Sequence, residues 1–110
     1  MISIQLIRKF FKTAKLGKHR IPGYEDCCSA VVLNPPTIDI TYRNYKVVAT
    51  AKSLTVFKVE TNKNLTALKL VTFNRYISKQ VFQSKFSSDL SYAIGTMYDA
   101  LESLLTGEEI

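Results

Sequence analysis

Residues 37–59 constrain the fold more than any other part of the chain, because three apolar–polar alternations follow one another there. Ile38, Ile40 and Tyr42 alternate with polar residues, and the same period returns in residues 45–52 and 54–59. A period of two residues is that of a β-strand with one buried face. With Arg43-Asn44 as a turn, these segments predict three strands in an antiparallel meander.

Two breaks precede this region. Residues 17–29, GKHRIPGYEDCCS, contain two glycines, a proline and the only histidine, and they are predicted to form a loop. Asn34-Pro35-Pro36 is the second break, because paired prolines exclude a helix. The short apolar run from Cys27 to Leu33 lies between them and fits either a buried strand or one to two helical turns.

The C-terminal region predicts a helix. Ser87-Ser88-Asp89 offers capping side chains, and Gly107 suits the left-handed residue that follows a helix. Asp99 and Glu102 are expected on its outer face. The apolar stripe has spacings of three and four residues and comprises Leu90, Ile94, Met97, Leu101, Leu104 and Leu105.

Residues 65–85 are compatible with two structures. The β-branched content up to Phe73 favours a strand. The spacing of Leu70, Phe73, Ile77 and Val81 fits a helix, with Asn62 or Asn64 available as its N-cap. The continuation through Val81 favours the helix, beginning at about residue 64.

The charge of the chain is concentrated at its start. The 110 residues carry fifteen Lys and Arg against nine Asp and Glu, a net charge of +6. Residues 21–110 hold nine bases and nine acids, so the whole excess lies in residues 1–20, which contain no acid. The six bases of this segment are Arg8, Lys9, Lys12, Lys15, Lys18 and Arg20.

The same segment has a helical period. Leu6, Ile7, Phe10, Phe11 and Ala14 share one helix face, and four of the bases lie opposite. Three interpretations remain open: a surface helix docked on the core, a basic face that contacts nucleic-acid phosphates, or a mitochondrial targeting segment. The bases chosen as polyanion contacts are the six named above.

The fold class expected from these patterns is α+β. An antiparallel sheet of three or four strands carries N-terminal and C-terminal helices packed on it. The length supports one compact domain, divided here into a basic amphipathic helix at 1–20 and an α+β domain at 21–110. No transmembrane segment is predicted, since no run approaches the roughly 18 apolar residues that a span needs.

The residues that usually carry catalysis do not form a recognisable set. His19 is a lone histidine in a basic loop, so no catalytic triad can be assembled around it. Cys27 and Cys28 are adjacent, and with one distant histidine they fall short of a zinc site; they are predicted to be apolar filler. We therefore expect no enzyme, cofactor or metal. Two cysteines without a signal peptide indicate a reducing compartment, cytoplasmic or nuclear, or mitochondrial if residues 1–20 are a targeting segment.

The run from Leu54 to Ile77, LTVFKVETNKNLTALKLVTFNRYI, resembles the small dimer-forming subunit of the KEOPS complex. That family has a strand, a short polar turn and a leucine–basic pair that opens a helix, here Leu68-Lys69. Ile21-Pro22 and the segment ending Leu33 to Pro36 look like its first helix and exit. The resemblance implies a non-catalytic subunit that helps a partner make the threonylcarbamoyl modification of tRNA. The partner-binding or homodimer residues are then Leu68, Lys69, Phe73, Ile77 and Val81.

The order of helix, three strands and helix is also that of double-stranded-RNA-binding domains. That family has lysines at the start of its last helix, where this chain has Ser87-Ser88-Asp89. An RNA surface would instead use the N-terminal helix or sheet lysines such as Lys46. Two functions follow: a non-catalytic subunit or adaptor of an RNA-associated complex, or a protein–protein interaction module without nucleic-acid contact.

Overall fold

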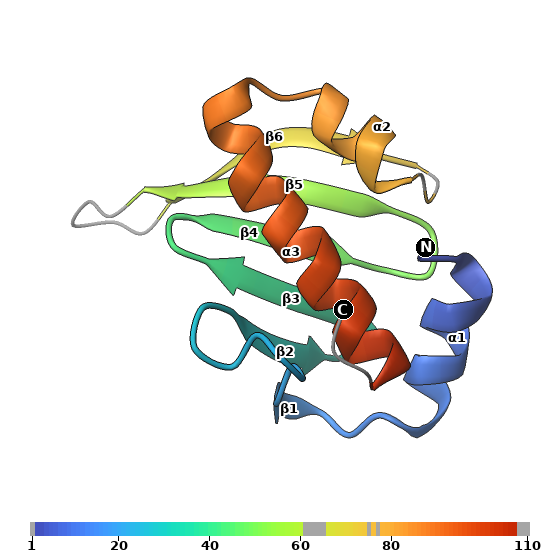
Figure 1. Ribbon diagram of the computed structural model, residues 1–110. Helices are drawn as coiled ribbons and strands as arrows, with labels where there is room; N and C mark the ends of the chain where they lie inside the picture. The colour runs from blue at the N-terminus through green and yellow to red at the C-terminus, as the bar shows by residue number, and fades with distance from the viewer. Residues whose placement is uncertain (1, 61–65, 75, 77, 108–110) are drawn as a thin grey trace.

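The computed structural model describes residues 2–60, 66–74, 76 and 78–107. Its architecture is α+β, with an open six-stranded antiparallel sheet and three helices within these residues (Figure 1). The elements, in chain order, are α1 (Ile4–Thr13), β1 (Gly17–His19), β2 (Ser29–Leu33), β3 (Thr37–Tyr42), β4 (Tyr45–Ala49), β5 (Leu54–Glu60), β6 (Thr66–Phe73), α2 (Lys79–Ser84) and α3 (Ser88–Thr106).

The sheet is a meander in which every strand pairs with the next one along the chain. The predicted three-strand core of β3, β4 and β5 is present and antiparallel. Arg43 lies in the tight turn between β3 and β4 and has a φ of 53°, in agreement with the predicted turn at Arg43-Asn44. The expected three or four strands become six because β1 and β2 extend one edge of the meander and β6 extends the other.

The strands β1 and β2 resolve two open points of the sequence analysis. Of the two structures considered for residues 27–33, the strand is the one formed, and it covers Ser29–Leu33. The predicted loop at 17–29 is wrong at its start, because Gly17–His19 pairs with β2 as an edge strand. A strand of three residues is too short to show a period, so only its partner reveals it.

The helix predicted from about residue 64 is also wrong, since β6 occupies Thr66–Phe73. The pairing with β5 contains an irregularity: Val56 pairs with Val71, but the next residue, Phe57, pairs with Lys69. The extra residue on β6 is Leu70, as in a β-bulge. It shifts the alternation by one position, so the run does not look like a regular strand in the sequence.

The helix α3 crosses one face of the sheet diagonally and provides most of its cover (Figure 1). Ile94, Met97 and Leu101 are fully buried against the strands. The helix ends before Gly107, whose φ of 72° is left-handed, and it begins after Ser87, so the predicted C-terminal helix and its boundaries are confirmed. Its core partners on the sheet include Val32, Ile38, Ile40, Val47 and Val56.

The helix α1 lies beside the C-terminal half of α3 (Figure 1). Ser3 is its N-cap and accepts a hydrogen bond from the Leu6 amide at 3.2 Å. Ile2 and Ile7 have no exposed surface. The helix spans ten residues, which is shorter than the predicted 1–20, because the chain leaves it at Ala14 and continues into the sheet as β1.

The helix α2 is a short element packed on the N-terminal half of α3 (Figure 1). Its Phe82 is fully buried. Lys79 Nζ lies 2.6 Å from an Asp99 carboxylate oxygen on α3. Asp99 was expected on the outer face of the helix, but its carboxylate contacts α2. Within the described residues, no helix is long and apolar enough to span a membrane.

Candidate polyanion-binding surface

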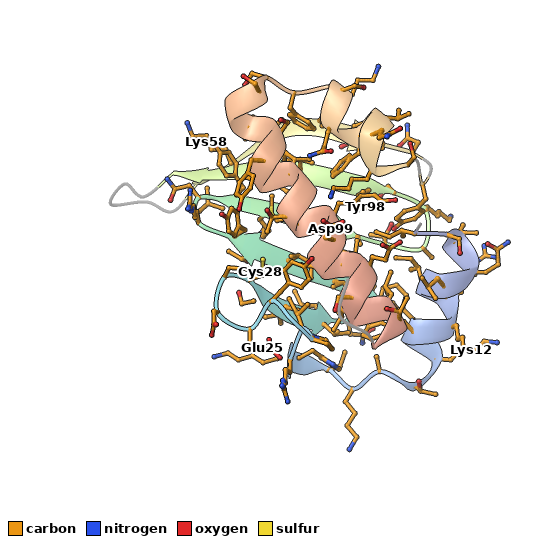
Figure 2. The ribbon with its side chains drawn as sticks, in the orientation of Figure 1. Lys12, Glu25, Cys28, Lys58, Tyr98 and Asp99 are labelled. Carbon is orange, nitrogen blue, oxygen red and sulfur yellow. The ribbon has the colours of Figure 1, made fainter. Side chains whose placement is uncertain are left out.

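The outer side of α1 carries three cations. Arg8, Lys9 and Lys12 are exposed, whereas Ile7 on the opposite side is buried. Leu6, Phe10 and Phe11 are partly buried and pack against the core on that inner side. Apolar packing therefore orients the helix so that its basic side faces solvent, as Lys12 does in Figure 2.

Two more cations continue from the end of the helix. Lys15 and Lys18 are both exposed. The intervening turn is tied to α1 and β1, because a ring nitrogen of His19 lies 2.6 Å from the Lys15 carbonyl oxygen and the His19 ring contacts Phe10 at a centroid distance of 5.8 Å. We call the set of Arg8, Lys9, Lys12, Lys15 and Lys18 the cationic strip.

No member of the cationic strip has an ion-pair partner among the described residues. The ion pairs there join Arg20 to Glu25, Lys46 to Asp39, and Lys79 to Asp99. The strip also contains no acid, since residues 2–20 have none. Within the described part of the chain its positive charge has no acidic partner, so it attracts solvent anions, which a polyanion would displace.

Arg20, the sixth predicted contact, differs from the other five. Its Nε donates to a Glu25 carboxylate oxygen at 2.7 Å, and both side chains are substantially exposed. Hydrogen bonds from the Glu25 backbone N–H and from the Arg20 guanidinium lower the pKa of the Glu25 carboxyl. The pair leaves Arg20 near the end of the strip but partly neutralised.

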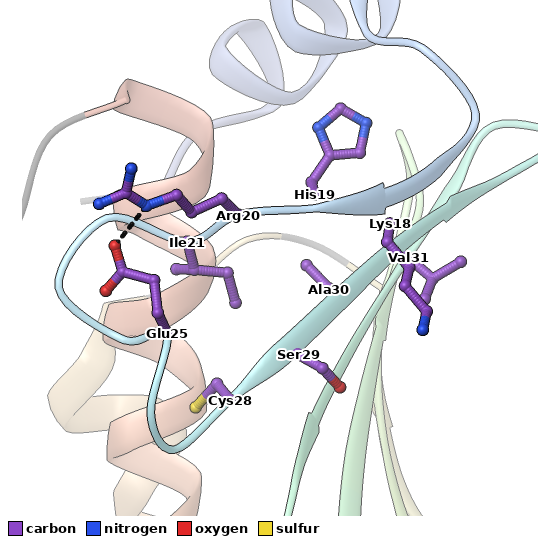
Figure 3. A pocket seen from close by; sticks show the side chains of 9 residues that line it. All are labelled: Lys18, His19, Arg20, Ile21, Glu25, Cys28, Ser29, Ala30 and Val31. Atoms are coloured by element: carbon purple, nitrogen blue, oxygen red, sulfur yellow. Dashed lines mark hydrogen bonds and ion pairs between the residues drawn. The ribbon is translucent and has the colours of Figure 1, made fainter.

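A pocket opens where the strip meets the sheet edge (Figure 3). It has a volume of about 320 Å³ and lies between β1, the start of β2 and the loop of residues 20–28. Its lining combines four apolar residues with five polar or charged ones, and it comprises Lys18, His19, Arg20, Ile21, Glu25, Cys28, Ser29, Ala30 and Val31.

Lys46 is not part of this surface. It lies on β4, where it pairs across the sheet with Thr41 and Phe57 on the face turned away from α3. Its Nζ is 3.8 Å from an Asp39 carboxylate oxygen and 5.4 Å from the centre of the Phe57 ring. Burial raises the pKa of Asp39, and the nearby Lys46 charge opposes this only in part.

The helix expected to carry the predicted partner-binding residues is not formed at residues 66–73, and partner binding by these residues stays a prediction. Leu68 and Lys69 belong to β6, where the resemblance implied the opening of a helix. Phe73 ends the same strand and contacts Phe82 at a centroid distance of 5.1 Å. Val81 lies on α2 and is 47% exposed. Ile77 lies outside the described residues.

The two cysteines have different environments. Cys28 is buried, in agreement with the filler interpretation, but Cys27 is exposed. Their sulfur atoms are 3.6 Å apart, and burial raises the pKa of Cys28 to about 12, so Cys28 is a poor nucleophile. No group of three potential metal ligands from His, Cys, Asp or Glu occurs in the described part of the chain.

Glu25 was not among the sequence-predicted site residues. It is five positions from Arg20 in an irregular loop, and such a spacing carries no periodic signal. Only the closure of the loop brings the two side chains together. The five strip residues, in contrast, follow from the count of charges along the sequence.

Comparisons of the chain with protein-family models, curated proteins and solved structures found no match. The resemblance to the KEOPS subunit therefore remains a hypothesis based on residues 54–77 and the upstream proline motifs.

Proposed function

We propose that this chain is a non-catalytic small subunit or adaptor of an RNA-associated complex and that the cationic strip contacts the RNA phosphates. The observation that carries the proposal is that five exposed cations, all between residues 8 and 18, have no ion-pair partner among the described residues. A tRNA is the natural first ligand, because the resemblance to the KEOPS subunit implies a role in tRNA modification.

The physical signature of such binding is its dependence on salt. Each phosphate neutralised by a lysine or arginine releases counterions, which lowers log K by about 0.7–0.9 per unit of log salt concentration. If all five strip residues engage phosphates, the total slope is about −3.5 to −4.5. Affinity for tRNA should then fall by roughly a hundredfold or more between 50 and 200 mM salt.

Deletion of residues 1–20 is a poor test, because it removes the edge strand β1 and the buried side chains of Ile2 and Ile7. The strip can instead be neutralised in place. The test variant is Arg8→Gln, Lys9→Gln and Lys12→Gln, three changes at exposed positions of α1. A matched control is Lys52→Gln, Lys58→Gln and Lys85→Gln, which removes the same charge from exposed positions elsewhere.

Fluorescence anisotropy with labelled tRNA across a salt series measures the slope of log K against log salt concentration for the unmodified chain and for each variant. We expect the α1 variant to lower the magnitude of the slope by about 2–3, and the control variant to leave most of it intact. Equal losses in the two variants would show that binding follows total charge rather than the strip. Absence of salt-dependent binding in the unmodified chain contradicts the proposal outright.

A second candidate function is a protein–protein interaction module. The observation that favours it is the sheet face turned away from α3, where Val31, Val48 and Phe57 remain partly exposed in the sheet interior. A second copy could cover this face. Sedimentation velocity over a dilution series tests it: a dimer that Val48→Lys disrupts supports this function, and a monomer at every concentration contradicts it.

A further inference from the structure

We propose, building on the RNA-binding function above, that the pocket beside β1 receives one unstacked base of a single-stranded RNA and that Glu25 reads the base edge. The pocket and the strip share Lys18, and Arg20 lies at the pocket's rim. A strand with a phosphate at Lys18 therefore lies beside the pocket. RNA recognition commonly uses such splayed bases from single-stranded regions.

The interior of the pocket suits the flat face of a base. Ile21 and Ala30 are each 1% exposed and Cys28 is 8% exposed, so they form a closed apolar floor, and the surface open to a base comes from the more exposed lining residues Val31, Lys18 and Arg20. A volume of about 320 Å³ is at the lower end of the range for small-ligand sites, which begins at roughly 300 Å³. That space is sufficient for one base.

The rim of the pocket distinguishes a base from a phosphate. Glu25 lines the same pocket as Lys18 and Arg20, and its pKa is lowered, so it is an anion at neutral pH. A carboxylate repels a phosphate but accepts hydrogen bonds from the N–H groups of a base. Guanine suits it best, because its Watson–Crick edge presents adjacent N–H donors.

The pocket wall is held in place before any ligand binds. The Ser103 hydroxyl on α3 donates to the Pro22 carbonyl oxygen at 2.6 Å. Within the loop, the Tyr24 amide donates to the Ile21 carbonyl oxygen at 3.0 Å, and the Cys28 amide donates to that of Tyr24 at 2.9 Å. The Arg20–Glu25 contact orients the carboxylate. Such preorganisation reduces the entropy lost on binding.

Asp26 provides a matched control for Glu25. It is exposed and adjacent in the same loop, but it does not line the pocket. The variants Glu25→Gln and Asp26→Asn remove the same charge from neighbouring positions. The two variants should therefore change RNA affinity equally through general electrostatics. A difference in RNA affinity between them would come from the pocket.

The experiment measures binding of the full chain to labelled RNA decamers by fluorescence anisotropy across a salt series, and the ligands are compared at equal salt concentration. One decamer contains only uridine, a second has guanosine at two central positions, and a ten-base-pair duplex is the third ligand. We expect about tenfold tighter binding of the guanosine decamer than of the uridine decamer. Glu25→Gln should abolish this preference, and Asp26→Asn should retain it.

Thermal unfolding of both variants confirms that they are folded. An independent measurement is the titration of the unmodified chain with GMP and UMP by NMR. We expect GMP, and not UMP, to shift the amide signals of Cys28, Ser29 and Ala30. Absence of such shifts, equal binding of both decamers, or loss of the preference in Asp26→Asn overturns the base-pocket proposal.

These outcomes separate the two proposals. Salt-dependent binding that is equal for single strands and duplex leaves the cationic strip as an RNA surface and overturns the base pocket. Absence of salt-dependent binding to any of the three ligands overturns both. A guanosine preference that survives Glu25→Gln overturns the role of Glu25 as the residue that reads the base.

Discussion

The helices α1 and α3 pack on the same core but use their outer sides differently. Asp99 of α3 pairs with Lys79 of α2, so the polar side of α3 makes a contact within the folded structure. The cations of α1 have no such partner among the described residues. Their burial differs as well, since α3 is covered by sheet and α2, whereas α1 buries only one side.

The difference teaches how a charged surface can be kept at little cost to stability. An exposed lysine without a partner has no folded-state contact to lose. The stability that α1 contributes must therefore come from its apolar side, and its basic side is available for binding. The following predictions test this division.

The largest effect is expected from the two sides of α1. Ile7→Ala removes a fully buried side chain and should lower the free energy of unfolding by about 2–5 kcal/mol. Lys12→Ala, on the exposed side, should change it by less than about 0.5 kcal/mol. Urea denaturation measures both. Similar losses for the two variants would contradict the division.

The helix ends give the next effect. Gly107 ends α3 at a φ of 72°, where a Cβ is unfavourable, whereas Ala14 ends α1 at a φ of −70°. Gly107→Ala should cost about 1–2 kcal/mol, and Ala14→Ser should stay within about 0.5 kcal/mol. Thermal unfolding followed by circular dichroism compares the variants. An equal loss of stability in the two variants would contradict the expectation that the left-handed φ at Gly107 makes its substitution more costly.

The ion pair between α2 and α3 should contribute less. Lys79 and Asp99 side chains are 41% and 23% exposed, so solvent screens their attraction. A double-mutant cycle with Lys79→Met and Asp99→Asn should give a coupling below about 1 kcal/mol. The same cycle with Arg8→Met in place of Lys79→Met should give none, and a coupling there would show that α1 cations do contribute to the fold.

The smallest effect is expected at Asp39, on the sheet face away from α3. Burial raises its folded-state pKa, so the folded chain binds this proton more readily than the unfolded chain. That contribution to stability is complete below the unfolded pKa of about 4 and is lost as pH rises through the folded pKa. The Asp39→Asn variant should therefore unfold at a slightly higher temperature than the unmodified chain at pH 7.

Unfolding temperatures of both chains between pH 3 and 7 provide the measurement. The advantage of Asp39→Asn should shrink as pH falls, and it should stay below about 0.5 kcal/mol at pH 7, because Lys46 partly compensates the charge. An advantage that grows toward low pH has the wrong sign for a raised pKa. It would show that the Lys46 contact, and not burial, dominates at Asp39.

Regular local patterns predicted much of the fold. The alternation in residues 37–59 predicted the meander, and Ser87 and Gly107 marked the ends of α3 correctly, although the Ser87 side chain makes no capping hydrogen bond. Residues 66–73 failed because a bulge at Leu70 breaks the alternation. Gly17–His19 failed because three residues show no period, and their strand exists only beside β2.

The candidate site was predicted in part for the same reasons. Charges can be counted along a sequence, so the five strip residues were identified, and each of them is exposed in the structure. Lys46 was grouped with them, although it lies on β4 beside an acidic partner, Asp39. The pocket and Glu25 were missed, since the loop of residues 20–28 forms the pocket only when it folds against β2 and α3.

The sequence by itself determined the α+β class, the meander at its centre and the concentration of positive charge at the start of the chain, because each is written in neighbouring residues. Tertiary structure decided the edge strands, the strand at residues 66–73 and the pocket. The physical reason is that strand pairing and loop closure depend on distant partners. Ser103 and Pro22, which are 81 positions apart, hold the loop that forms the pocket.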